Sequence, residues 1–367
     1  SPQVFRSPGR VNLIGEHTDY NNGFVLPAAI NKELYFAISP NTLGVSRIHA
    51  YDLDKSAEID LENIQPSDQQ WQNYLLGVLA QFKKQALPIR NFDLVYGGNI
   101  PIGAGMSSSA AVECGLAFGL NHIFKLNIDK FTLAKMGQKA EHEYAKVMSG
   151  LMDQFANLFG KAKHVVKLDC RSLEYQYYPF DLKDYRIVLC DTKVKHSLAS
   201  SEYNNRRKEC EEGVAILTRH DARIQSLRDV TPAFLEQHKA ELPTIVYRRC
   251  VYVVNEIQRV QEACLDLENN DLEAFGKKMY ETHDGLQQDY EVSCEELDFL
   301  VDRTRDNEAV LGARMMGGGF GGCTINLVKQ DALDRFIEDI SQAYFQHFNV
   351  QPETYITEIV DGTSIYK

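Results

Sequence analysis

Short runs of β-forming residues alternate with helical patterns in the first half of the chain. Runs of β-branched and aromatic residues between turn residues predict four strands, at residues 34–38, 46–51, 92–96 and 165–168. Apolar residues that recur every three or four positions predict one helix along 112–124 and another along 133–144. This half of the chain is therefore expected to mix helices and strands.

The second half follows a different order. A domain boundary is expected near residues 179–184. Beyond it the pattern predicts a strand, three long helices, two strands, a helix and a strand, at 185–190, 201–218, 245–267, 272–286, 312–316, 323–328, 332–348 and 354–359. This order is typical of a ferredoxin-like domain. We therefore predict an α+β protein with two domains, residues 1–180 and 181–367, which suits a chain of 367 residues.

The composition narrows the classes of function. Acidic residues outnumber Lys and Arg, 51 to 39, and the net charge of -12 argues against a protein that binds nucleic acid or an acidic membrane. The chain has no apolar run long enough to predict a membrane span. Its first residues lack the apolar core of a signal peptide, and Ser1 in place of Met leads us to expect a processed start.

Eight cysteines are scattered along the chain, and no two of them form a CxxC pair. Zinc sites need clustered ligands, and disulfide frameworks are typical of short secreted chains. We therefore expect buried free thiols and a cytoplasmic protein.

A glycine-rich segment at 101–111 follows a predicted strand and opens the predicted helix. Gly103 and Gly105 allow a ligand to approach the backbone closely, and Ser107 and Ser108 suit a helix N-terminus. The start of a helix binds anions through its free N–H groups. The segment is not a Walker A loop, because it lacks the Gly-Lys-Ser/Thr ending. The alternative is an ordinary glycine turn with a serine cap.

A second glycine cluster, 317–324, separates two predicted strands. Five glycines in the six positions 317–322 exceed what a hairpin turn needs, which favours close contact with a ligand. The alternative is a flexible loop.

Polar residues follow a short alternating pattern near the start of the chain. Val11 and Leu13 suggest a strand, and Glu16, His17 and Asp19 come directly after it. Such a group of donors and acceptors suits a polyhydroxylated ligand. The alternative is a solvated turn.

Two carboxylates lie further along the chain. Glu141 falls on a predicted helix, and Asp153 falls in a turn marked by Gly150. One carboxylate is suited to holding a metal ion and the other to acting as a base. The alternative is a pair of surface charges.

Together these segments resemble the GHMP kinase family over nearly the whole chain. Residues 10–22 resemble the motif of the members that phosphorylate galactose, 101–111 the phosphate-binding motif, and 317–324 the third motif of the family. Segment 150–154 and the surroundings of Tyr203 match as well.

Two departures from the motifs, Met106 and Leu151, keep the hydrophobic volume. The resemblance implies a first domain with a left-handed βαβ unit, a ferredoxin-like second domain and an active site in the cleft between them.

The resemblance also implies an ATP- and Mg²⁺-dependent kinase that phosphorylates D-galactose on its anomeric hydroxyl. Asp153 would take the proton of that hydroxyl or guide it electrostatically, and Arg10 would lie between its oxygen and the γ-phosphate. The sugar would be held by Glu16, His17, Asp19, Gly150, Tyr203 and Gly319. ATP would be held by Trp71 and Tyr74 at the adenine and by Gly103, Gly105, Ser107 and Ser108 at the phosphates. Mg²⁺ would be held by Ser109 and Glu141.

Two alternatives stay open at this point. Relatives of the family phosphorylate N-acetylgalactosamine, arabinose or other small alcohols. Others sense galactose and ATP without turnover, and these have a damaged phosphate motif, whereas residues 107–111, Arg10 and Asp153 are intact here. We expect a monomer or a weak homodimer.

Overall fold

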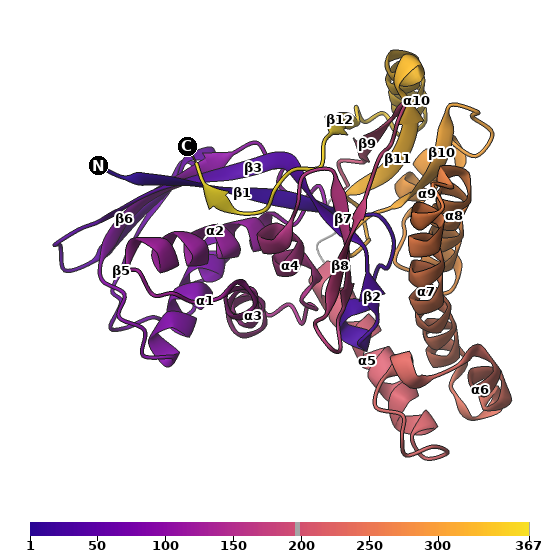
Figure 1. Ribbon diagram of the computed structural model, residues 1–367, viewed down its shortest axis with the longest axis horizontal. Coiled ribbons are helices and arrows are strands. Elements are labelled where there is room, and N and C mark those ends of the chain that lie inside the picture. The colour runs from indigo at the N-terminus through magenta and orange to yellow at the C-terminus, as the bar shows by residue number, and fades with distance from the viewer. Residues whose placement is uncertain (195–198, 367) are drawn as a thin grey trace.

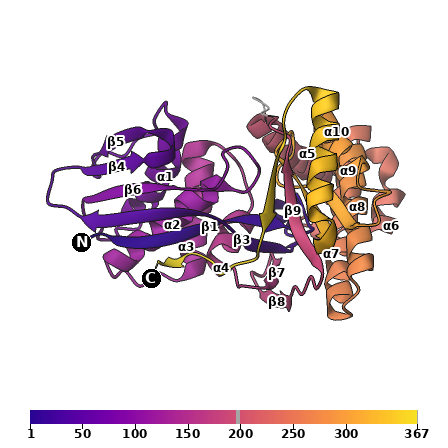
Figure 2. The ribbon, with the colours of Figure 1, turned by 90° about the horizontal axis from the view of Figure 1, so that it is seen from above.

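The chain folds into two lobes that meet near the middle of the molecule (Figures 1 and 2). The computed structural model describes residues 1–194 and 199–366, without the side chains of residues 199 and 200. Strands β1 (Gln3–Asn12) and β3 (Pro27–Pro40) run through the first lobe toward the second (Figure 2). Residues at the central ends of these two strands therefore lie at the junction between the lobes.

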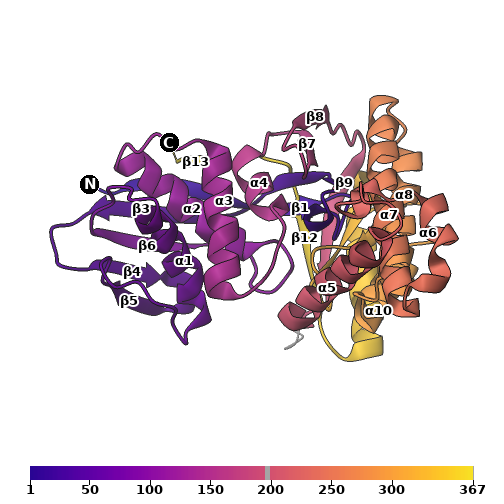
Figure 3. The same ribbon diagram turned by 90° about the horizontal axis from the view of Figure 1, so that it is seen from below.

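The first lobe is built on a six-stranded sheet in the order β13-β1-β3-β6-β4-β5. Its other strands are β4 (Ser46–Ala50), β5 (Lys55–Ile59), β6 (Phe92–Gly98) and β13 (Ser364–Ile365). Helices cover one face of the sheet (Figures 1 and 3): α1 (Gln70–Lys84), α2 (Ser108–Ile123), α3 (Lys130–Ala140) and α4 (Met152–Phe159). Phe5, Phe36 and Leu116 are fully buried in the core between these layers.

A small sheet, β2-β7-β8, lies beside the junction of the lobes. Its strands are β2 (Phe24–Val25), β7 (His164–Asp169) and β8 (Tyr175–Pro179). Short helical turns connect the larger elements: η1 (Asp19–Asn21), η2 (Tyr51–Leu53), the π-helical turn η3 (Glu141–Ala145), η4 (Leu227–Asp229), η5 (Lys239–Glu241) and η6 (Gln330–Ala332).

The second lobe has a four-stranded antiparallel sheet in the order β10-β11-β9-β12. These strands are β9 (Tyr185–Asp191), β10 (Val310–Met315), β11 (Cys323–Lys329) and β12 (Glu353–Thr357). The helices are α5 (Ala199–Leu217), α6 (Pro232–Gln237), α7 (Thr244–Glu268), α8 (Leu272–Gln288), α9 (Glu295–Asp302) and α10 (Leu333–Phe348). The first strand lies between the third and the fourth, so the predicted ferredoxin-like order is confirmed.

Three details differ from the sequence predictions. The predicted helix 133–144 ends at Ala140 and continues as the π-helical turn η3. Asp153 lies in the first turn of α4, not in a turn between elements. The predicted last strand, 354–359, ends at Thr357, and the chain then returns to the first lobe as β13 beside β1. The domain division at 180/181 stays a prediction, and it did not include this return.

No helix in the described part of the chain has the length and apolarity needed to cross a bilayer.

Candidate active site

An arginine and an aspartate from different elements form a two-pronged ion pair at the junction of the lobes. Nε of Arg10 donates to Oδ1 of Asp153 at 2.7 Å, and Nη2 donates to Oδ2 at 3.0 Å. Nη1 of Arg10 donates to the carbonyl of Gly105 at 2.6 Å, and the Ser107 hydroxyl donates to Oδ2 of Asp153 at 2.5 Å. Such paired, charge-assisted hydrogen bonds fix both position and orientation. They join β1, α4 and the glycine-rich segment.

The local backbone explains how Arg10 reaches this position. The pairing of β1 with β3 shifts register between Pro8 and Gly9. The N–H of Arg10 then donates to the carbonyl of Met106 at 3.1 Å, which ties the strand to the glycine-rich segment. Burial works to lower the pKa of Arg10, but the charges of Asp153, Glu16 and Asp19 outweigh it and raise the pKa above its ordinary value. Arg10 therefore stays a cation.

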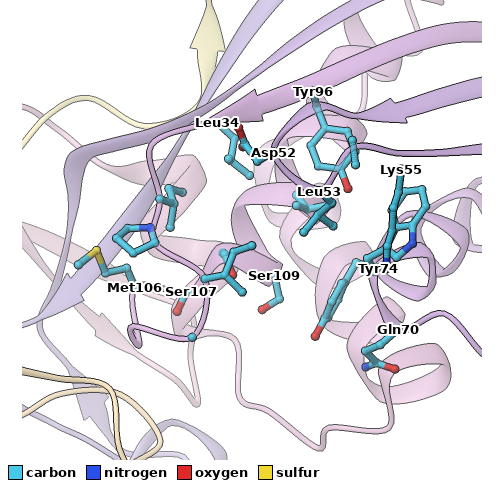
Figure 4. A pocket seen from close by; sticks show the side chains of 18 of the residues that line it. Leu34, Asp52, Leu53, Lys55, Gln70, Tyr74, Tyr96, Met106, Ser107 and Ser109 are labelled. Atoms are coloured by element: carbon cyan, nitrogen blue, oxygen red, sulfur yellow. The ribbon is translucent and has the colours of Figure 1, made fainter. Parts of the chain in front are cut away.

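A cavity of about 870 Å³ opens beside Arg10 in the first lobe (Figure 4). Trp71 and Tyr74 from α1 line it together with the apolar side chains of Leu34, Leu53 and Tyr96. The glycine-rich segment and the first turn of α2 contribute Gly103, Gly105, Ser107, Ser108 and Ser109. Apolar and aromatic walls with a few convergent polar groups are typical of a site for a small organic ligand.

The glycine-rich segment needs unusual backbone angles. Gly103 and Gly105 have φ values of +81° and +77°, which favour glycine. Ser107, the N-cap of α2, also has a positive φ of +57°. Its hydroxyl does not cap the helix but donates to Asp153, so the N–H groups at the helix start are left for a ligand.

A smaller pocket, lined by several charged side chains, also borders Arg10. It is lined by Arg10, Glu16, His17, Asp19, Ser149, Gly150, Met152, Asp153, Tyr203, Gly317 and Gly318. Arg10 and Gly318 line both pockets, so the two are adjacent. A Cβ atom on Gly150 would lie 1.9 Å from Oδ2 of Asp19, which leaves no room for any other residue. The lining suits a small polyhydroxylated molecule.

His17 is held as a neutral imidazole with a fixed orientation. Nδ1 hydrogen-bonds to the Tyr20 hydroxyl at 2.6 Å, and Nε2 lies 3.2 Å from the carbonyl of Gly318. Burial lowers the pKa of His17 to about 4, against the smaller effect of Glu16. The Tyr20 hydroxyl also hydrogen-bonds to the hydroxyl of Tyr290 at 2.7 Å. A tyrosine of the second lobe therefore supports this side of the pocket.

Two further carboxylates of the pocket differ in their surroundings. Glu16 accepts hydrogen bonds from Arg314 and from the N–H of Gly317, both at 2.9 Å. Burial, followed by the charge of Asp153, raises the pKa of Asp19 to about 7. Asp19 therefore exchanges its proton near neutral pH.

Ser109, which lines the large cavity, and the buried Glu141, which bonds to it, offer neighbouring oxygen ligands. The Ser109 hydroxyl donates to Oε1 of Glu141 at 2.7 Å, and the Ser149 hydroxyl donates to Oε2. Burial is the main cause that raises the pKa of Glu141. A carboxylate and a hydroxyl are hard oxygen donors of the kind that Mg²⁺ prefers, so these residues fit that ion.

The structure places the predicted site residues along one or other of the two pockets, with two exceptions. Glu141 lines neither pocket but accepts a hydrogen bond from Ser109, which lines the large cavity. Gly319 lines neither pocket, because its Cα packs on Val292, whose carbonyl would lie 2.1 Å from a Cβ. Gly317 and Gly318 line the smaller pocket in its place. Sequence reasoning missed Arg314, Tyr290 and Ser149. A lone arginine in an otherwise apolar strand was the one available signal, for Arg314.

Three family matches cover most of the chain. Residues 1–40 match the family described as "Galactokinase galactose-binding signature". Residues 73–161 match "GHMP kinases N terminal domain", and residues 262–346 match "GHMP kinases C terminal".

Individual relatives extend these matches over the full length. A galactokinase from Thermotoga maritima is 40% identical over 97% of this chain and 98% of its own length. A galactokinase from Clostridium acetobutylicum is 42% identical over 98% of this chain and 93% of its own. The crystal structure of Lactococcus lactis galactokinase complexed with galactose superimposes with a TM-score of 0.96 at 34% identity, over 100% of this chain and 95% of that one.

Mevalonate kinase from Methanococcus jannaschii, with a TM-score of 0.69 at 17% identity over 98% of this chain and 99% of that one, shares the fold. The two-domain architecture and these matches define a kinase of the GHMP type, which uses ATP. Within that class, the chain belongs to the galactokinase family.

Proposed function

We propose that the protein transfers the γ-phosphate of ATP to the anomeric hydroxyl of D-galactose, giving galactose 1-phosphate and ADP, as the entry step of galactose catabolism. One observation carries this proposal: Arg10, paired with Asp153, lines both the large cavity and the small polar pocket. A phosphate donor in one pocket and a sugar in the other would meet at this ion pair.

In this proposal Asp153 contacts the anomeric hydroxyl and takes its proton or guides it. Three hydrogen bonds, two from Arg10 and one from Ser107, hold the orientation of its carboxylate. Arg10 lies between the sugar oxygen and the γ-phosphate, where its hydrogen bonds can strengthen as negative charge shifts. Phosphoryl transfer depends mostly on positioning and charge stabilisation, and this pair supplies both.

Sugar recognition is assigned to the polar pocket. Glu16, His17, Asp19 and Tyr203 accept and donate hydrogen bonds to the hydroxyls, with backbone help near Gly150. Galactose differs from glucose at one hydroxyl, and a buried carboxylate that expects it is left unpaired by the wrong epimer. Gly319 does not contact the sugar in this proposal. It acts indirectly, because its packing on Val292 shapes the loop that carries Gly317 and Gly318.

ATP is assigned to the large cavity. Trp71 and Tyr74 line the adenine end, and Gly103, Gly105, Ser107 and Ser108 cradle the phosphates with the helix N-terminus. Ser109 and Glu141 hold Mg²⁺, which when bound offsets charge on the phosphate oxygens. A cytoplasmic location belongs to the same proposal and is supported by the eight free cysteines.

The test is ADP release by the purified protein with Mg-ATP and a panel of galactose, glucose, N-acetylgalactosamine, arabinose and no sugar. We expect turnover with galactose well above the rest. Higher turnover with another sugar would show that this sugar is the preferred substrate, and the assignment as a sugar kinase would stand. Galactose binding without turnover of any sugar would identify a sensor and overturn the proposed activity.

A further inference from the structure

Two histidines and a glutamate meet in the second lobe, apart from both pockets. His220 lies in the turn after α5, His238 directly follows α6, and Glu241 ends η5. Figure 1 shows α6 at the end of this lobe opposite α10. We propose that these three side chains form a binding site for a transition-metal ion of the Zn²⁺ type.

The ligand atoms already converge. Nε2 of His220 lies 2.5 Å from Oε2 of Glu241, and Nδ1 of His238 lies 3.0 Å from Oε1. One nitrogen of each ring and one carboxylate oxygen all lie within 4.8 Å of one another. Tetrahedral Zn²⁺ with bonds of about 2.0–2.1 Å places its ligand atoms about 3.4 Å apart.

The backbone holds the three residues in place without a metal. The N–H of His220 donates to the carbonyl of Leu217, and the N–H of Glu241 donates to the carbonyl of His238, both at 3.0 Å. The His238 ring packs on Phe234, with ring centroids 4.5 Å apart, and on His220 at 4.2 Å. Preorganised ligands lose little conformational entropy when an ion binds.

The ligand types select the class of ion. Imidazole nitrogens favour Zn²⁺, Cu²⁺ and Ni²⁺, whereas Mg²⁺ and Ca²⁺ prefer sites made only of oxygen. Three protein ligands leave a fourth position for water, and the exposure of His220 and Glu241 leaves that side open. The site is therefore distinct in chemistry from the Ser109–Glu141 pair.

A bound ion would join two connections that are separate in the chain. His220 anchors the end of α5, and His238 with Glu241 anchors the connection from α6 to α7. Because ions that bind only the folded state stabilise it, Zn²⁺ should raise the thermal midpoint of the protein.

The test is calorimetric titration of the chelator-treated full chain with ZnCl₂ in excess MgCl₂, together with thermal unfolding. We expect one Zn²⁺ per chain and a rise in the thermal midpoint. His220→Ala and Glu241→Gln should each weaken Zn²⁺ binding by at least about tenfold. Removing a residue that only supports a metal ligand already weakens metal binding by about that much, and these variants remove a ligand itself. Both variants should keep the thermal midpoint of the metal-free protein and the wild-type sugar-dependent ADP release, which shows that they fold.

The matched control is His347→Ala. His347 is another histidine of the second lobe beside a carboxylate, 3.8 Å from Glu295, but among the residues that the structure describes no third ligand joins them. This variant should bind Zn²⁺ like the wild type. Absence of Zn²⁺ binding to the wild type, or equal binding to the His220 and Glu241 variants, would overturn the site.

Discussion

The guanidinium of Arg314 lies fully buried against the carboxylate of Glu16, with Nη2 2.9 Å from Oε1. Nε of Arg314 also donates to the carbonyl of Leu13 at 2.9 Å, and Nη1 donates to that of Met315 at 2.6 Å. Arg314 lies on β10 of the second lobe, and Glu16 follows β1 of the first. The pair therefore ties the wall of the small pocket, which Glu16 lines, to both lobes.

Removing one member of this pair should be costly. Arg314→Met leaves the Glu16 charge buried without its partner, and we expect a loss of about 3–5 kcal/mol in the free energy of unfolding, measured with urea. Arg335→Met, which removes an exposed arginine 3.5 Å from Asp339, should cost less than about 1 kcal/mol. Equal losses in the two variants would contradict a structural role for the buried pair.

The proposed role of Asp153 predicts a selective loss of turnover. Asp153→Asn keeps the shape of the side chain but removes its charge, so kcat should fall about 10²- to 10⁴-fold. Asp93→Asn, at an exposed aspartate paired with Arg47, should leave kcat unchanged. An Asp153→Asn variant that keeps more than about a tenth of wild-type kcat would exclude Asp153 as the base.

Asp19 should govern the affinity for sugar and not for nucleotide. Asp19 lines the small pocket and not the large cavity. Asp19→Ala should therefore raise KM for galactose far more than KM for ATP, as steady-state kinetics with each substrate varied in turn will show. Equal effects on both constants would remove Asp19 from the sugar site.

The raised pKa of Asp19 also predicts how stability changes with pH. Burial and the charge of Asp153 move this pKa from 3.8 to about 7 in the folded protein. Between these values the unfolded chain loses a proton that the folded chain keeps, so this group lowers the free energy of unfolding as pH rises. Asp19→Asn should therefore gain stability over the wild type progressively from pH 4 to 7 and no further above 7. If urea unfolding shows the same gain in the free energy of unfolding at every pH, the pKa of Asp19 is not raised in the folded protein.

Tyr290 should position His17 through Tyr20. Tyr290→Phe removes the hydroxyl that bonds Tyr20 at 2.7 Å and Cys210 at 3.2 Å. Losing such a bond costs about 1 kcal/mol, so KM for galactose should rise about fivefold while kcat and KM for ATP stay close to wild type. The control is Tyr344→Phe, because the Tyr344 hydroxyl is also buried but bonds the Thr192 carbonyl in a separate core cluster. A KM for galactose that rises equally in both variants would indicate general loosening instead.

The sequence predicted elements well where the pattern had a period. The strand order of the second lobe followed from long, regular helices between short β-rich runs. Helix α1 was missed because residues 75–82 are all buried, which leaves no polar face to reveal a helical period. Strand β13 was missed because two residues carry no pattern, and only pairing with β1 makes them a strand.

The residues of the candidate site were likewise predicted only in part. The glycine-rich segment was predicted from its own residues as a ligand site, Trp71 and Tyr74 were predicted from the family resemblance, and all of them line one cavity. Arg314 could not be connected with Glu16 in advance, because the two are 298 positions apart and tertiary packing brings the Leu13 carbonyl to the guanidinium. Gly319 was expected at the sugar because the family resemblance implied that role for this member of the glycine motif. Motif membership does not distinguish a glycine that lines a pocket from one that packs behind it.

The return of the chain to β1 has a consequence for synthesis. Ser364 and Ile365 pair with Arg6 and Phe5, and the Arg6 guanidinium donates to the Ser364 hydroxyl across 358 positions. At ordinary translation rates, roughly 20–70 seconds separate the appearance of these partners at the ribosome. During that interval the outer edge of β1 has no partner strand, and an unpaired edge is a template for association with other chains. The first lobe is thus completed only after the second lobe has been translated, because β13 pairs with the edge of β1 from the far side of that lobe in the sequence.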